Sequence, residues 1–158
     1  MKLQNCIIDG RRAVEIVEWL AIKGVSNSDD YKWKKFIRYN LVEDKQQIEL
    51  LSLYNKYDYQ NEYIGPGQRM ILTPMTEKCW STLLISLHNS FSSSIAGPVG
   101  AGKSSTILDL AKSMGVFCIA FDCNQQVSRM SLSRLFYGLI QQGLWTCIDQ
   151  FEKIDRLT

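Results

Sequence analysis

The sequence predicts an α/β protein with parallel strands that is organised around a phosphate-binding loop. Residues 97–104 have the spacing GxxxxGK[ST], which is typical of loops that hold phosphate groups. Two short apolar runs, residues 116–121 and 144–148, are each followed by an aspartate and have the length of buried strands. Residues 130–142 lie between them and carry apolar side chains at helical spacing. A strand–helix–strand order of this kind indicates a parallel sheet.

Residues 1–60 are expected to be mostly helical. Apolar residues at helical spacing follow Asp9, a good N-cap, and stop before Gly24. The next segment, residues 31–39, mixes lysines with aromatic residues, a combination that could stack nucleic-acid bases. Because acidic residues flank these lysines, we interpret the segment as a solvated face with its aromatic side chains turned inward.

A change in composition near residue 61 marks a second segment, 61–158. A strong turn signal at residues 65–67 precedes a helix that we expect from Thr76 to about Asn89. The apolar face of this helix comprises Cys79, Trp80, Leu83, Leu84 and Leu87. The one histidine, His88, falls at the end of the helix, so we interpret it as a surface position and not as a metal ligand.

Each residue type of the phosphate-loop motif has a chemical reason. The glycines let backbone N–H groups approach phosphate without a Cβ in the way. Lys103 places a positive charge on the β- and γ-phosphates, and Ser104 offers a hydroxyl to Mg²⁺. A helix expected at residues 104–113, ended by Gly115, adds its N-terminal dipole. The predicted phosphate-binding residues are Gly97, Pro98, Val99, Gly100, Ala101, Gly102, Lys103, Ser104 and Ser105.

A second magnesium ligand is expected where a neighbouring strand ends. Asp149 follows the apolar run 144–148, so we predict that it positions Mg²⁺ directly or through water. The next residue is Gln150, whose carboxamide can orient water but cannot accept its proton at neutral pH. Glu152 serves instead only if the chain has already turned. Loss of a general base costs about 10²–10⁴ in rate, so the sequence predicts binding without efficient hydrolysis.

Composition argues against several classes of protein. The 18 Lys and Arg against 16 Asp and Glu give a net charge of +2, without the basic field of a nucleic-acid binder. Five cysteines without a CxxC pair favour buried reduced thiols over disulfides or zinc, and hence a reducing compartment such as the cytoplasm. No apolar run approaches the roughly 20 residues of a membrane span. The residues after Met1 do not resemble a signal peptide.

Several motifs together resemble the first AAA+ module of dynein heavy chains. Residues 62–80, EYIG…RMILTPMTEKCW, are similar to that family's EYLG…RLVITPLTDRCY. The loop GPVGAGKS at 97–104 is similar to its GPAGTGKT. Residues 135–151, LFYGL…GLWTCIDQF, resemble its FxGL…GAWxCFDEF, with glutamine in place of the catalytic glutamate. Residues 33–39, WKKFIRY, resemble the end of the mechanical linker, and the likeness extends over about residues 31–156.

The resemblance implies a fold, cofactors and partners. Residues 1–60 would be the C-terminal end of the linker, and 61–158 part of an AAA+ ATP-binding domain with a three-layer core. It implies ATP and Mg²⁺, with Mg²⁺ on Ser104 and Asp149. It places adenine against Ile71, Leu72 and Thr73. Also implied are a dynein complex and AAA+ ring as partners, ATP-driven movement on microtubules through parts not present here, and a cytoskeletal, axonemal location in a cilium.

Three hypotheses follow, from different classes. The first is the ATP-binding part of a dynein heavy chain, expected to be a short isoform or fragment because few residues follow Asp149. The second is a non-catalytic interaction protein with a vestigial loop, which a lack of nucleotide-dependent stabilisation would favour. The third is another P-loop enzyme, such as a small kinase or GTPase. Against the third, the sequence has no arginine-rich lid and no guanine-selecting Asn-Lys-x-Asp.

Overall fold

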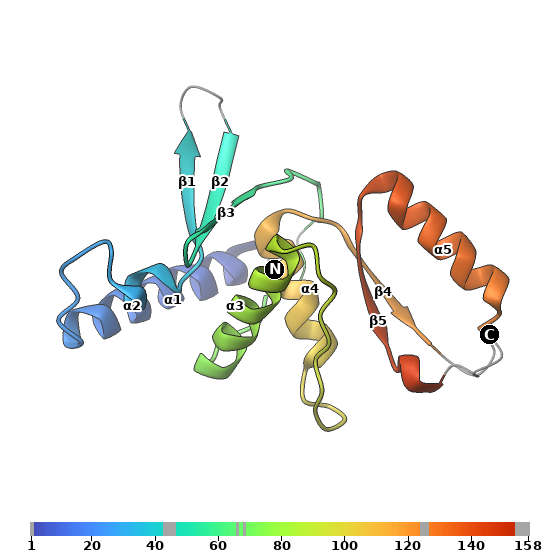
Figure 1. Ribbon diagram of the computed structural model, residues 1–158. Coiled ribbons are helices and arrows are strands. Elements are labelled where there is room, and N and C mark those ends of the chain that lie inside the picture. The colour runs from blue at the N-terminus through green and yellow to red at the C-terminus, as the bar shows by residue number, and fades with distance from the viewer. Residues whose placement is uncertain (1, 43–46, 66, 68, 124–126, 154–158) are drawn as a thin grey trace.

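The computed structural model describes residues 2–42, 47–65, 67, 69–123 and 127–153. In chain order the elements are α1 (Lys2–Ile22), α2 (Tyr31–Lys34), β1 (Arg38–Val42), β2 (Gln47–Ser52), β3 (Asn55–Asp58), α3 (Pro74–His88), α4 (Lys103–Met114), β4 (Cys118–Asp122), α5 (Arg129–Gln142), β5 (Trp145–Asp149) and the 3-10 turn η1 (Phe151–Lys153). In Figure 1, α1 lies at the foot of the sheet β1–β3, and α3 and α4 lie side by side in the centre. Strands β4 and β5 and helix α5 form the C-terminal side of the molecule.

Helix α1 begins earlier than the sequence predicted. Asp9 lies inside the helix and is not its N-cap. Residues 2–8 contain neither glycine nor proline and include strong helix formers, so nothing ends the helix at Asp9. The predicted end is confirmed, because the helix stops at Ile22 and Gly24 takes a left-handed φ of +64°.

Strands β1, β2 and β3 form an antiparallel meander where a mostly helical segment was expected. The order is β1–β2–β3, with Leu50 of the central strand opposite Tyr39 on one side and Tyr57 on the other. Leu50 and Ser52 are buried, which is the period-two pattern of a strand with one face on the core. Aromatic and branched residues on these strands fit a pleated, half-buried surface, so tertiary packing decides in favour of strands.

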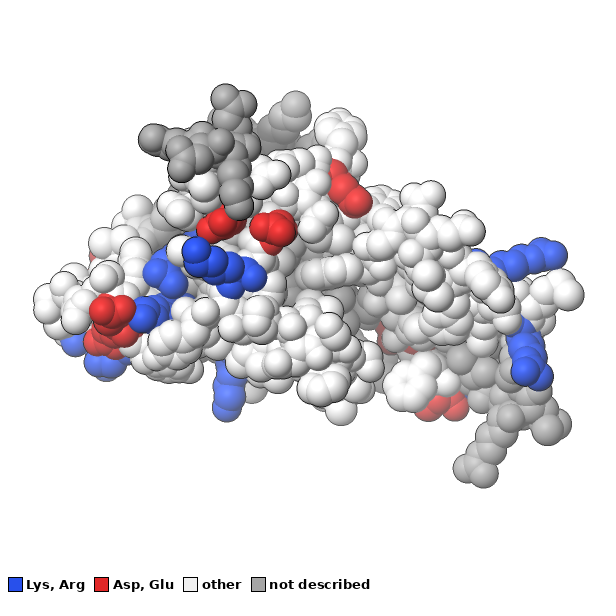
Figure 2. Space-filling model, turned by 45° about the horizontal axis from the view of Figure 1, so that its top comes forward, with Lys and Arg blue, Asp and Glu red and all other residues white. Residues whose placement is uncertain are grey.

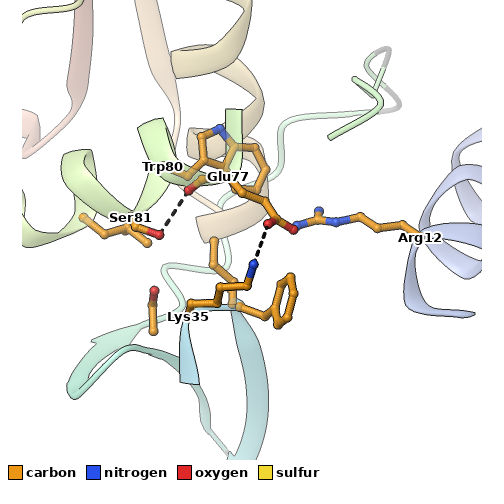
Figure 3. A pocket seen from close by; sticks show the side chains of 9 residues that line it. Arg12, Lys35, Glu77, Trp80 and Ser81 are labelled. Atoms are coloured by element: carbon orange, nitrogen blue, oxygen red, sulfur yellow. Dashed lines mark hydrogen bonds and ion pairs between the residues drawn. The ribbon is translucent and has the colours of Figure 1, made fainter. Parts of the chain in front are cut away.

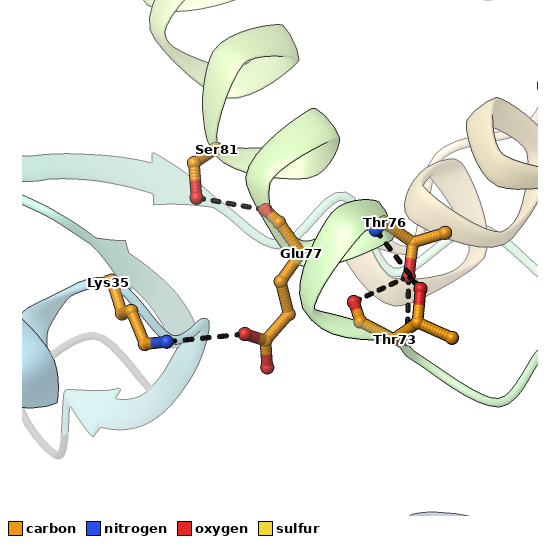
Figure 4. A network of polar contacts seen from close by, with 5 residues as sticks. All are labelled: Lys35, Thr73, Thr76, Glu77 and Ser81. Atoms are coloured by element: carbon orange, nitrogen blue, oxygen red, sulfur yellow. Dashed lines mark hydrogen bonds and ion pairs between the residues drawn. The ribbon is translucent and has the colours of Figure 1, made fainter.

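Helix α3 has the start that its sequence favours. The Thr73 hydroxyl accepts from the backbone N–H of Thr76, and the Thr76 hydroxyl accepts from the backbone N–H of Thr73 (Figure 4). Pro74 occupies the first turn of the helix. Of the predicted apolar face, Trp80, Leu83 and Leu84 are buried, and Leu87 is exposed. His88 is the last residue of the helix and is exposed, as predicted.

One apolar core joins the meander to α3 and α4. Its buried members are Leu50, Trp80, Leu83, Leu84, Leu110, Met114 and Val116. Because Leu50 comes from the first 60 residues and the others follow residue 61, the two predicted segments share this core. The core therefore holds α4, and with it the phosphate-loop segment, against the N-terminal part of the chain.

Strands β4 and β5 are parallel, with Asp122 opposite Asp149 at the carboxyl edge. Helix α5 ends at Gly143, which takes φ +65°, as its pattern predicts. Residues 91–98, which lead into the phosphate loop, form no strand. A strand needs a hydrogen-bonded neighbour, and within the described part of the chain β4 and β5 pair only with each other.

The face shown in Figure 2 carries acidic and basic side chains that are interspersed, with broad uncharged areas between them. None of the helices described combines the length and apolar character that crossing a bilayer requires. Several large apolar side chains of α5 are exposed, namely Met130, Phe136, Tyr137 and Ile140. No residue of α5 is buried.

Candidate functional site

The phosphate-loop motif forms an exposed turn that leads directly into α4. Gly100 and Gly102 both take φ +78°, a conformation that favours glycine. Gly102 is the N-cap, and the helix starts at Lys103, one residue earlier than predicted. The Thr106 N–H donates to the Gly102 carbonyl over 2.9 Å. The amides of residues 103–105 precede that bond and are the donors that a helix leaves without internal acceptors, so they are available to an anion.

The ammonium group of Lys103 lies over the start of the loop. Its Nζ donates to the carbonyl oxygens of Pro98, at 2.9 Å, and of Gly97, at 3.1 Å. These two carbonyl oxygens therefore bind the ammonium group that the motif would place on the phosphates. The side chain of Val99 is fully exposed.

Ser104 and Asp149 meet, although 45 residues separate them. The Ser104 hydroxyl donates to Asp149 Oδ2 over 2.5 Å, and the Gln150 N–H donates to Asp149 Oδ1 over 2.9 Å. The bond from Ser104, helped by the Gln150 N–H and the charges of Lys103 and Lys153, lowers the pKa of Asp149 below its usual value. A hydroxyl beside an ionised carboxylate fits the oxygen ligands that Mg²⁺ prefers.

The chain turns immediately after Asp149. Gln150 takes φ +55°, its side-chain oxygen accepts from Lys153 Nζ, and η1 follows. Glu152 is exposed on that turn. Burial, followed by the negative charges of Asp122 and Glu152, raises the pKa of the nearby Cys123 thiol.

The three residues expected near adenine differ in what they offer. Ile71 is 74% exposed. Leu72 packs against the apolar core, and Thr73 is engaged as the N-cap of α3. Ile71 thus offers an exposed apolar side chain, and adenine contact at this segment stays a prediction.

A buried charge pair at the middle of α4 was not predicted. Asp109 of α4 is 2% exposed, and Arg69 Nη1 lies 3.5 Å from its Oδ1. Arg69 Nη2 also lies 3.5 Å from Asp9 Oδ1 on α1 and donates to the Ser113 hydroxyl over 3.1 Å. Burial raises the pKa of Asp109 while Arg69 opposes that shift. An aspartate directly before Leu110, on the apolar face of the predicted helix, was the available signal.

Comparison with known proteins agrees with this geometry. Residues 59–157 match the family described as the hydrolytic ATP binding site of the dynein motor region. The chain is 34% identical over 155 residues to dynein axonemal heavy chain 1 of Mus musculus, which covers 98% of the chain and 4% of that relative. It is 33% identical over 149 residues to the ciliary dynein beta chain of Tripneustes gratilla, covering 94% of the chain and 3% of the relative. It is 34% identical over 141 residues to dynein axonemal heavy chain 5 of Rattus norvegicus, covering 89% of the chain and 4% of that relative. The chain therefore spans only a few per cent of the length of these relatives.

Proposed function

Because this chain belongs to the dynein heavy chain family and matches its hydrolytic ATP-binding region, we propose that it binds Mg·ATP at residues 97–105 without hydrolysing it efficiently. The observation that carries the proposal is the 2.5 Å contact between the Ser104 hydroxyl and Asp149. It brings the two predicted magnesium ligands together beside the start of α4, where Lys103 and the first helical amides lie.

The roles of the residues follow from their positions. Lys103 Nζ would leave the carbonyl oxygens of Gly97 and Pro98 for the phosphates, since a phosphate oxygen carries more negative charge than a carbonyl. The amides of residues 103–105 would donate to the same group. Ser104 and Asp149 would hold Mg²⁺, which neutralises negative charge on the phosphates.

Weak hydrolysis follows from Gln150. A carboxamide has no proton-accepting form at neutral pH, and its oxygen is already engaged by Lys153. The chain has turned at this point, and Glu152 lies exposed on η1, where no described contact holds its carboxylate. Slow or absent release of phosphate is the expected behaviour.

The wider role is proposed from the relatives. Those named above are axonemal or ciliary dynein chains. We propose that the chain acts within a dynein complex and an AAA+ ring, in microtubule-based movement at the axoneme. Within it, residues 1–60 would correspond to the end of the linker and 61–158 to the ATP-binding domain.

The exposed apolar face of α5 favours a second candidate, a non-catalytic interaction protein with a vestigial loop. Tyr137 and Ile140 lie exposed one helical turn apart on this helix. In that case the loop would bind no nucleotide, so a measurement of binding separates the two candidates.

Thermal unfolding with and without Mg·ATP tests the proposal. A ligand that binds only the folded chain stabilises it by about 2.7 kcal/mol at a concentration of 100 Kd. We expect a rise in the unfolding midpoint that Lys103→Ala largely abolishes. No rise, or an equal rise in the variant, would overturn the proposed function and favour the interaction protein.

A further inference from the structure

We propose that Trp80 is a positioning residue for the phosphate-binding loop, an inference that rests on the proposed function. Trp80 lies on α3 and is 3% exposed. Its indole N–H donates to the backbone carbonyl of Thr106 on α4 over 3.0 Å, in a buried contact that spans 26 residues of chain. The sequence predicted Trp80 only as part of an apolar helix face.

Thr106 links the indole to the phosphate loop through hydrogen bonds to Gly102. Its backbone N–H and its hydroxyl both donate to the carbonyl of Gly102, over 2.9 Å and 2.8 Å. Gly102 is the N-cap from which Lys103 and Ser104 follow. An indole that fixes Thr106 therefore fixes the first turn of α4, and with it the direction of the amides that would meet a phosphate.

Charged side chains also lie around the indole ring. Arg12 of α1 lies with its Cζ 5.4 Å from the centre of the Trp80 ring. Glu77, one turn before Trp80, pairs with Lys35 over 3.5 Å. Figure 3 shows Arg12, Lys35 and Glu77 directed toward one another beside the ring.

The surroundings leave Trp80 little room to move. The cavity beside it, lined also by Phe36, Ser52 and Leu84, has a volume of about 10 Å³. That is roughly the space of one water molecule. Trp80 is packed in the apolar core, and its N–H lies on Thr106.

Trp80→Phe removes the N–H and keeps an aromatic ring in the core. A buried carbonyl that loses its donor weakens whatever state the bond supported, by about three- to tenfold for one hydrogen bond. We expect the Kd for Mg·ATP to rise by that factor, measured well below the unfolding midpoint. A purely structural role would lower the midpoint and leave the Kd unchanged.

Two further variants make the test specific. Leu83→Val trims packing on the same helix and in the same core but touches no polar atom of α4, so it should lower the unfolding midpoint without changing the Kd. Thr106→Val keeps the side-chain shape and removes the hydroxyl bond to Gly102. It should weaken binding as Trp80→Phe does, and it serves if Trp80→Phe does not fold.

Amide hydrogen exchange of the nucleotide-free chain gives a readout that does not need binding. Trp80→Phe should speed exchange at Thr106, in the first turn of α4, and leave exchange in α5 unchanged. Unchanged exchange at Thr106, or an unchanged Kd in a chain that binds Mg·ATP, would overturn the role of Trp80. If the unaltered chain binds no Mg·ATP, the proposed function fails first, and the exchange data still show whether Trp80 fixes the loop.

Discussion

The hydroxyl of Ser104 donates to the carboxylate of Asp149 over 2.5 Å, joining the first turn of α4 to the end of β5. These are the two residues that the sequence assigns to Mg²⁺ from separate motifs. Their contact brings together two oxygen groups of the kind that Mg²⁺ prefers. When Mg²⁺ binds, the hydrogen bond between them would give way to the metal.

Replacing Asp149 tests this ligand set. Asp149→Asn removes the negative charge and keeps the shape, so we expect ATP affinity to lose its dependence on Mg²⁺ while metal-free ATP binds as before. Binding titrations with Mg²⁺ and with EDTA give the comparison. Asp122→Asn, at the paired position of β4, is the control and should keep the Mg²⁺ effect. Equal Mg²⁺ dependence in all three chains would contradict the assignment.

The same hydrogen bond predicts a pH effect on stability. It lowers the pKa of Asp149 in the folded chain below the ordinary aspartate value of about 3.9. Its contribution is therefore present above about pH 4 and is lost as the pH falls through the folded pKa. Ser104→Ala should be less stable than the unaltered chain by a constant margin from pH 7 to about pH 5, and the margin should shrink at lower pH. A margin that grows on acidification would contradict the account.

Gln150→Glu supplies the missing proton acceptor. Since a general base contributes about 10²–10⁴ in rate, we expect phosphate release under single-turnover conditions to rise at least tenfold. Gln150→Met, which offers no base, should stay at the level of the unaltered chain. If Gln150→Glu also stays there, a missing base is not what limits hydrolysis.

Two glycines with the same backbone conformation should respond differently to alanine. Gly115 and Gly143 both take φ +65°, where a Cβ costs about 1 kcal/mol. A Cβ at Gly115 would also lie 2.5 Å from the ring of Tyr59, whereas nothing lies within 4 Å at Gly143. Gly115→Ala should therefore lower the unfolding free energy by about 2–4 kcal/mol and Gly143→Ala by about 1. Urea unfolding measures both unfolding free energies. Equal decreases in the two variants would show that the Tyr59 ring moves aside without lowering stability.

The sequence predicted best where local signals agree with the packing. Gly115 and Gly143 mark the ends of α4 and α5, and the apolar run before Asp149 forms β5. It missed the meander because the turn between β2 and β3 uses Leu53 at φ +54°, with no glycine or asparagine to announce a hairpin. Asp9 failed as an N-cap because the residues before it also favour helix.

In the candidate site too, residues defined by a motif were predicted and contacts that depend on packing were not. Motif spacing predicted Lys103, Ser104 and Asp149, because their chemistry depends on residue type. The hydrogen bond from Trp80 to Thr106 could not be predicted from the sequence, because it depends on how α3 and α4 pack. Both residue types are also common in an ordinary core.

Equilibrium binding of Mg·ATP, followed by isothermal titration calorimetry, tests the central claim most directly. The account predicts saturable binding at one site per chain, with at least tenfold weaker binding by Lys103→Ala and unchanged binding by Lys78→Ala, a control at an exposed lysine on α3. Absence of binding by the unaltered chain, or equal binding by all three, would contradict it.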